Sequence, residues 1–162
     1  MKKIRILGVD PGYAIVGFGI LDYDGVKFTP VEYGAILTEA HTPFPERLAS
    51  IHTDMEFIFN KYAPECMAIE KLYFNTNQKT GIDVAQARGV TVLSAATRGI
   101  PISEYTPLQV KSAVVGYGKA EKNQVMEMTR QILGLAQIPK PDDAADALAI
   151  AICHGHTIRW MR

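Results

Sequence analysis

The sequence has little cysteine and no long hydrophobic run. Its two cysteines, Cys66 and Cys153, lie in apolar segments without the close spacing of metal-ligand or redox pairs, so we expect buried, inert thiols in a cytoplasmic protein. No apolar run approaches the length of a bilayer span, so we expect no transmembrane helix and no membrane partner. The apolar stretch behind the basic N-terminus is broken by Asp10, which argues against a signal peptide.

Net charge is also absent, since 17 Lys and Arg residues balance 17 Asp and Glu residues. The charges are unevenly distributed, however. Residues 1–70 hold 6 basic against 10 acidic residues, whereas residues 71–130 hold 8 basic against 4 acidic ones. The middle of the chain is therefore a candidate phosphate-binding surface, with ordinary solvated faces as an equally good interpretation.

Length and hydrophobic patterning predict one domain covering residues 1–162, with no linker and no internal repeat. Alternating or continuous aliphatic runs predict strands, and apolar residues at helical spacing predict helices. The predicted strands cover residues 3–9, 15–23, 26–38, 66–70 and 100–105, and the predicted helices cover 45–62, 81–98, 107–115, 120–133 and 140–156. Three antiparallel strands followed by helix-separated parallel ones predict an α/β fold, a five-stranded mixed sheet with helices on both faces.

Four carboxylates occur on apolar elements. Asp10 and Glu70 each end a predicted strand, and Asp143 and Asp146 lie three residues apart on the last helix, on one face. Each has an ordinary interpretation as a turn residue, a solvated strand end or a helix-start acid. Brought together, they would repel one another unless a cation lay between them, and hard oxygen ligands suit Mg²⁺ or Mn²⁺. Two such ions are the arrangement used for phosphodiester hydrolysis.

Basic and aromatic residues surround these acids in the sequence. Lys111 and Lys122 flank a Gly-Tyr-Gly segment and could clamp a phosphate, although most lysines are simply solvated. Tyr73 and Phe74 follow Glu70 and could stack on an unpaired base, or lie in the core. Lys79 and Lys119 are further candidates for contacts with DNA.

Several motifs, in order and over nearly the whole chain, resemble the RuvC-type Holliday-junction resolvases of bacteria. These motifs are Gly8-Val-Asp10-Pro-Gly12, Ala68-Ile-Glu70, Gln86-Ala-Arg88-Gly89-Val90, Gln109-Val-Lys111, Val114-Val-Gly116-Tyr-Gly118, Ala120-Glu-Lys122 and Asp143-Ala-Ala-Asp146-Ala-Leu-Ala-Ile-Ala-Ile-Cys-His154. The resemblance implies an RNase H-like fold, a homodimer and Mg²⁺-dependent paired incisions in four-way DNA junctions. It also implies a partnership with the branch-migration motor of the same pathway and a cytoplasmic, nucleoid-associated protein.

The resemblance also implies roles for single residues. Asp10, Glu70, Asp143 and Asp146 look like the catalytic acids that hold the metal, with two Mg²⁺ per site. Lys111 and Lys122 look like the basic pair of the active site, and Tyr73 stands where relatives place an aromatic that stacks in the opened junction. Because Asp142 precedes Asp143, either of them could supply the ligand at the start of the helix.

Other functions remain open at this stage. An RNase H-like nuclease acting on RNA–DNA hybrids would use similar acids, and a junction-binding module without catalysis could hold a structural ion. An actin-like ATPase domain is disfavoured by the short chain. Because apolar residues cover more than one face of helix 81–98, we expect this helix to form much of the dimer contact, a hypothesis that Val90→Glu would test.

Overall fold

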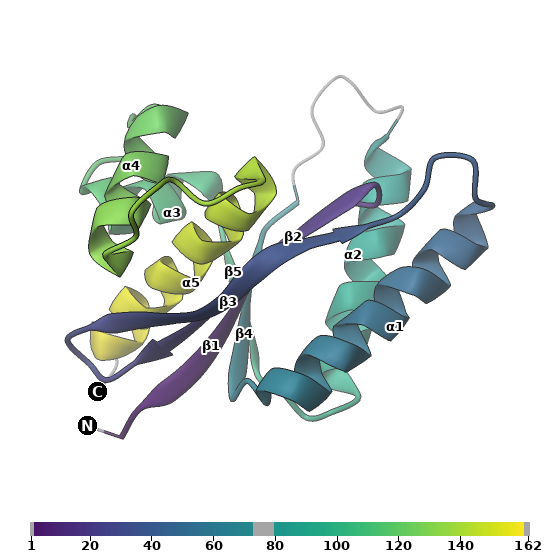
Figure 1. Cartoon of the computed structure of the whole chain (residues 1–162), viewed down its shortest axis with the longest axis horizontal. Helices are drawn as coiled ribbons and strands as arrows, with labels where there is room; N and C mark the ends of the chain where they lie inside the picture. Colours follow the sequence, from purple (N-terminus) through teal and green to yellow (C-terminus); the bar gives the residue numbers. More distant parts are fainter. Residues whose placement is uncertain (1, 73–79, 161–162) are drawn as a thin grey trace.

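A central five-stranded mixed sheet organises the protein, whose computed structural model describes residues 2–72 and 80–160 (Figure 1). The strand order is β3-β2-β1-β4-β5. Strand β2 pairs antiparallel with both β1 and β3, and β4 pairs parallel with both β1 and β5. The elements are β1 (Ile4–Asp10), β2 (Ile15–Tyr23), β3 (Phe28–Leu37), α1 (Phe44–Tyr62), β4 (Cys66–Glu70), α2 (Gly81–Ala96), β5 (Ile102–Tyr105), α3 (Pro107–Val115), α4 (Lys122–Leu133) and α5 (Asp142–Trp160). The predicted α/β fold with a mixed sheet is confirmed.

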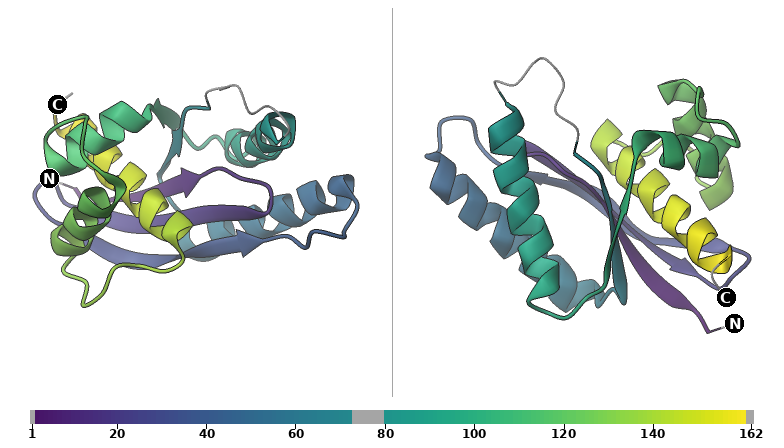
Figure 2. Two further views of the ribbon diagram at one scale, coloured as in Figure 1. Left: turned by 90° about the horizontal axis from the view of Figure 1, so that it is seen from above. Right: turned by 180° about the vertical axis from the view of Figure 1, so that it is seen from behind.

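Each face of the sheet has its own apolar core. One core joins the sheet to α3, α4 and α5, and the other joins it to α1 and α2, as predicted for helices on both faces (Figure 2). Neighbouring residues of β4 show the division, since Ala68 belongs to the first core and Ile69 to the second. Within the described ranges, no helix has the length and apolar character needed to cross a membrane.

Two glycines allow α5 to lie directly on the sheet. A Cβ atom added to Gly8 of β1 would come within 2.0 Å of the Ala147 carbonyl oxygen, and one added to Gly17 of β2 would come within 2.0 Å of the Asp143 carbonyl oxygen. Any side chain at these positions would push the helix away. Because Gly17 is the β2 partner of Asp10, this packing places the start of α5 beside the end of β1.

Some element boundaries differ from those predicted. Helix α2 ends at Ala96 rather than Arg98, because the chain turns through Gly99, whose φ is +68°. Strand β5 begins at Ile102, after Pro101, which has no N–H group to offer to a ladder. Helix α5 continues to Trp160, beyond the predicted end near His156. The pairing of β2 with β3 shifts register between Ile20 and Leu21, where Pro30 of β3 is the partner of Leu21.

Candidate active site

Three elements that are far apart in the sequence bring four carboxylates together. Asp10 ends β1 and Glu70 ends the neighbouring parallel strand β4, so both acids leave the sheet at the same edge. Helix α5, held against β1 and β2, adds Asp143 and Asp146 from its first two turns. The predicted convergence of acids is thus present in the fold.

The acids strongly affect one another's ionisation. Burial, followed by the negative charges of Asp146, Glu70 and Asp143, raises the pKa of Asp10 from its ordinary 3.8 to about 8. Burial is also the largest cause of the raised pKa values of Glu70 and Asp146. Ionising several carboxylates in one partly buried site costs free energy, because burial and mutual repulsion both disfavour the charged forms. Nearby positive charge would lower that cost.

Two lysines partly offset the negative charge of these carboxylates. The Lys122 ammonium lies 3.6 Å from a carboxylate oxygen of Asp146, with the lysine 61% and the aspartate 33% exposed. The positive charges of Lys111 and Lys122 oppose the rise in the pKa of Glu70. The predicted basic pair therefore lies beside the acids, on α3 and at the first position of α4.

A cavity of about 240 Å³ opens between these groups. Acids and lysines form its polar wall, whereas side chains of α3, α4 and α5 form an apolar floor. It is lined by Glu70, Pro107, Val110, Lys111, Lys122, Val125, Asp146, Ala149 and Ile150. Charges that line a partly enclosed pocket interact more strongly than the same charges do in bulk water.

The local structure fixes the position of Lys111. Helix α3 begins with a capping box in which the Thr106 hydroxyl accepts from the Gln109 backbone and the Gln109 side chain accepts from the Thr106 backbone. Just before it, the Tyr105 hydroxyl is hydrogen-bonded to Nδ1 of buried His154 on α5, at 2.7 Å. These contacts tie the start of α3 to both the sheet and α5.

The remaining predicted residues are distributed differently. Asp142 is turned toward Lys140, 4.0 Å away, and its charge is not among those that raise the pKa of Asp10, whereas the charge of Asp143 is. Lys119 is exposed and does not line the cavity. The predictions for Tyr73, Phe74 and Lys79 fall outside the described residues.

Sequence reasoning missed an exposed aromatic in the connection between the helices that carry the two lysines of the site. Tyr117, 49% exposed, lies in the α3–α4 connection and its hydroxyl donates to Gln124 at 3.1 Å. Leu108, 62% exposed, packs so closely on neighbouring Gly118 that a Cβ there would lie 2.2 Å from its side chain. The signal was visible in the sequence, since an aromatic between two glycines and between two lysines is well placed for exposure.

The metal-free protein is expected to lose stability as the pH rises from about 4 to about 8, the interval between the ordinary and the raised pKa of Asp10. The folded state holds the Asp10 proton more tightly than the unfolded chain does, so its ionisation favours unfolding. The loss should amount to a few kcal/mol, because one pKa unit corresponds to about 1.36 kcal/mol.

Urea unfolding in a chelating buffer at pH 5 and pH 8 measures this loss. Asp10→Asn should remove most of it and should be more stable than the unchanged protein at pH 8. An equal pH dependence in both proteins would contradict the clustering of charge around Asp10.

The sheet order and the carboxylate site at its edge define an α/β protein of the RNase H-like class. The family described as "Crossover junction endodeoxyribonuclease RuvC" matches residues 6–154. The chain therefore belongs to the RuvC family of crossover junction endodeoxyribonucleases.

Individual relatives agree over nearly the full length. A crossover junction endodeoxyribonuclease RuvC from Alkaliphilus oremlandii is 55% identical over 94% of this chain and 93% of its own. The structure of Thermus thermophilus RuvC superposes with a TM-score of 0.91 at 33% identity, covering 98% of this chain and 97% of the other. The same relative in complex with a Holliday junction substrate gives a TM-score of 0.87 at 31% identity, covering 97% and 96%.

Proposed function

We propose that this protein is an endonuclease that resolves four-way DNA junctions by paired, metal-dependent hydrolysis of phosphodiester bonds. The observation that carries the proposal is the meeting of Asp10, Glu70, Asp143 and Asp146, with Glu70 and Asp146 lining one cavity together with Lys111 and Lys122. Family membership supports the nuclease activity, and a relative with 31% identity is described with a Holliday junction substrate.

The donor set fits a divalent cation. Four carboxylates and no histidine or cysteine ligands match Mg²⁺, with Mn²⁺ as a substitute, and two ions per site suit the number of acids. In the described ranges, no three His, Cys, Asp or Glu side chains are already grouped around a metal position. When bound, the cations would supply an activated water and charge neutralisation at the scissile phosphate.

The side chains of the protein supply binding and orientation. Asp10, Glu70, Asp143 and Asp146 would hold the cations, and Lys111 and Lys122 would hold phosphate oxygens and offset charge that develops during cleavage. Lys119 and Tyr117 are both exposed in the α3–α4 connection, where a lysine can contact the DNA backbone and an aromatic can stack on a base. Tyr73, Phe74 and Lys79 remain proposed DNA contacts from the sequence.

A homodimer would match the two-fold symmetry of a four-way junction and let two active sites cut opposing strands. Helix α2 offers a seam through Ile82, Gln86, Gly89 and Leu93, all exposed and spaced four, three and four residues apart. Ile82 and Leu93 are 65% and 61% exposed, and Gly89 has open space around it. This α2 stripe is the proposed dimer contact.

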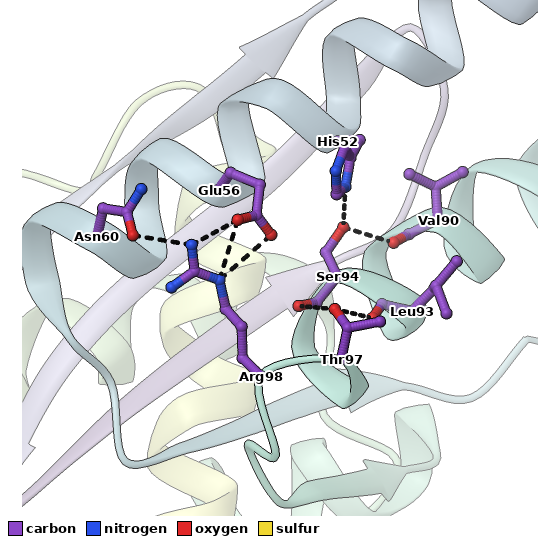
Figure 3. A network of polar contacts seen from close by, with 8 residues as sticks. All are labelled: His52, Glu56, Asn60, Val90, Leu93, Ser94, Thr97 and Arg98. Carbon is purple, nitrogen blue, oxygen red and sulfur yellow. Dashed lines mark hydrogen bonds and ion pairs between the residues drawn. The ribbon is translucent and has the colours of Figure 1, made fainter.

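Another side of α2 is already occupied by α1 (Figure 3). His52 and Ser94 share a hydrogen bond of 2.8 Å, and Arg98, just after α2, binds Glu56 and Asn60. Val90 packs against the core beneath α2, so Val90→Glu would damage the fold and is a poor test of the seam. Leu93 on the α2 stripe is the better position.

The proposed substrate is tested by incubating the protein with a synthetic mobile four-way junction and with an RNA–DNA hybrid duplex, each with and without Mg²⁺. We expect symmetric cuts in the junction only with Mg²⁺, with 3′-hydroxyl and 5′-phosphate ends that DNA ligase can seal, and little cutting of the hybrid. Preferred cutting of the hybrid would contradict junction resolution.

The branch-migration motor is the proposed partner, and the cytoplasm, in association with the nucleoid, is the proposed location.

A further inference from the structure

Arg88 contacts the backbone of a proposed catalytic acid from the far side of the sheet. Its Nε donates to the carbonyl oxygen of Glu70 at 3.3 Å, and its Nη2 donates to the Glu104 carboxylate at 2.7 Å. The side chain is only 17% exposed, although it carries a permanent charge. Arginine is a residue that can serve both acceptors at once, because its guanidinium presents several donors in a fixed plane.

The Glu70 carbonyl needs this donor because the sheet cannot supply one. On the β5 side, the Met67 N–H donates to the Pro101 carbonyl just before β5 at 2.9 Å, and the Lys71 N–H donates to the Tyr105 carbonyl at 2.8 Å. The alternation along β4 therefore turns the backbone groups of Glu70 toward β1. Continuing the β1–β4 register by one residue beyond its last pair sets the Glu70 carbonyl opposite the nitrogen of Pro11. Proline has no N–H, and a part-buried carbonyl without a donor is costly, so Arg88 fills the place.

The backbone carbonyl and the side chain of Glu70 are thus held from opposite faces of the sheet. Its side chain enters the cavity on the α5 side, beside Asp146 and the lysines. Arg88 belongs to α2, and Ile69 next to Glu70 packs into the core beneath α2. Arg88 therefore contacts neither the carboxylates of the site nor the cavity, and can influence them only through the backbone at the end of β4.

We propose that Arg88 is a positioning residue that fixes the end of β4, and with it the Glu70 carboxylate, and that it connects α2 to the active site. This inference rests on the proposed function, because Glu70 matters to cleavage only if the site is a nuclease. It assigns Arg88 a role distinct from a DNA contact. Since the same helix carries the α2 stripe, displacement of α2 would be transmitted to Glu70 through this side chain.

Three variants test the proposal. Arg88→Met keeps the length and apolar stem but removes every donor, Arg88→Lys restores one donor group, and Glu104→Gln is the matched control. We expect Arg88→Met to lower the single-turnover cleavage rate at saturating protein about 10- to 100-fold, the usual range for residues that orient metal ligands. Junction affinity without metal should change less than about threefold, because the Arg88 side chain is mostly buried and does not line the cavity. Arg88→Lys should recover part of the rate, and Glu104→Gln should lose little, since its amide oxygen still accepts from Arg88.

A second readout needs neither metal nor DNA. Hydrogen exchange of the Lys71 amide, which donates to β5 just beyond Glu70, should be at least about tenfold faster in Arg88→Met than in the unchanged protein and in Glu104→Gln. Unchanged Lys71 exchange, or an unchanged cleavage rate in folded Arg88→Met, would overturn the proposal. If Arg88→Met does not fold, Arg88→Lys decides by the same two measurements. If the protein without any substitution does not cut junctions, the proposed function is overturned. The hydrogen-exchange measurement would still test the positioning role of Arg88.

Discussion

Asp146→Asn is expected to slow junction cleavage on the order of 10³-fold or more, which is typical for the loss of a group that takes part directly in the chemistry. Asparagine keeps the size and shape of the side chain but removes the charge that interacts with Asp10 and Lys122. Binding of the junction, measured by gel shift without metal, should stay within about threefold, because phosphate contacts dominate DNA affinity. The cleavage rate is measured under single-turnover conditions at saturating protein.

Asp142→Asn is the matched control for this prediction. It makes the same change on the same helix, at a carboxylate that is 55% exposed and paired with Lys140 outside the acid cluster. Its cleavage rate should stay within about threefold of the unchanged protein, since exposed ion pairs contribute little. Equal losses in both variants would show that charge at the start of α5 matters in general, and that Asp146 has no special part. Cutting by Asp146→Asn at the normal rate would remove it from the catalytic acids.

Leu93→Glu is expected to convert the proposed dimer into monomers. It places a charge at the C-terminal end of the α2 stripe, where Leu93 is 61% exposed in the single chain and would be buried between two copies. Burying an unpaired carboxylate costs several kcal/mol, which is comparable to the stability of many interfaces. The association state is measured by analytical ultracentrifugation over a range of protein concentrations.

The functional consequence can be read on a supercoiled plasmid that extrudes a cruciform. Paired incisions release a linear product, whereas unpaired ones release a nicked circle, so Leu93→Glu should shift the products to nicked circles. Val26→Glu is the control, because Val26 is 83% exposed at the β2–β3 turn and lies outside α2. A dimeric Leu93→Glu, or dissociation of both variants, would contradict a seam on the α2 stripe.

The strands and most helices were predictable because their local signals agree with the fold. Strand β4, Cys66–Glu70, is a short apolar run ending in an acid, as expected for a buried parallel strand, and was predicted with its observed bounds. Strand β2 and helix α3 also have their predicted bounds. The errors occur at ends, as in α2 and β5, where a glycine turn or a proline limits the element.

The meeting of the acids was predictable only in part. Adjacent parallel strands place Asp10 and Glu70 at one edge, which the strand order alone implies. The approach of Asp143 to the other acids depends on α5 lying on Gly8 and Gly17. This is a contact between backbones, which the pattern of side chains in the sequence does not predict. The choice of Asp143 over Asp142 likewise depends on how the first turn of α5 faces the sheet.

Orientation around a helix axis was the harder problem. Because α2 has apolar residues on several sides, the sequence did not decide which of them face the core, and Val90 proved to be inward while Leu93 is outward. The contact of Arg88 with the Glu70 carbonyl was equally hidden, since its acceptor belongs to the backbone. Pro11, directly after β1, leaves a gap in the continued β1–β4 ladder because it has no N–H to donate.

The most direct test is anomalous diffraction from crystals of the protein soaked in Mn²⁺, which scatters strongly and substitutes for Mg²⁺ at oxygen sites. Strong peaks in coordinating contact with carboxylate oxygens of Asp10, Glu70 and Asp146 are the expected result, and Asp10→Asn crystals should lose or weaken them. Saturating Mn²⁺ that supports junction cutting in solution but leaves no peak among these acids would show that they are not where the cation acts.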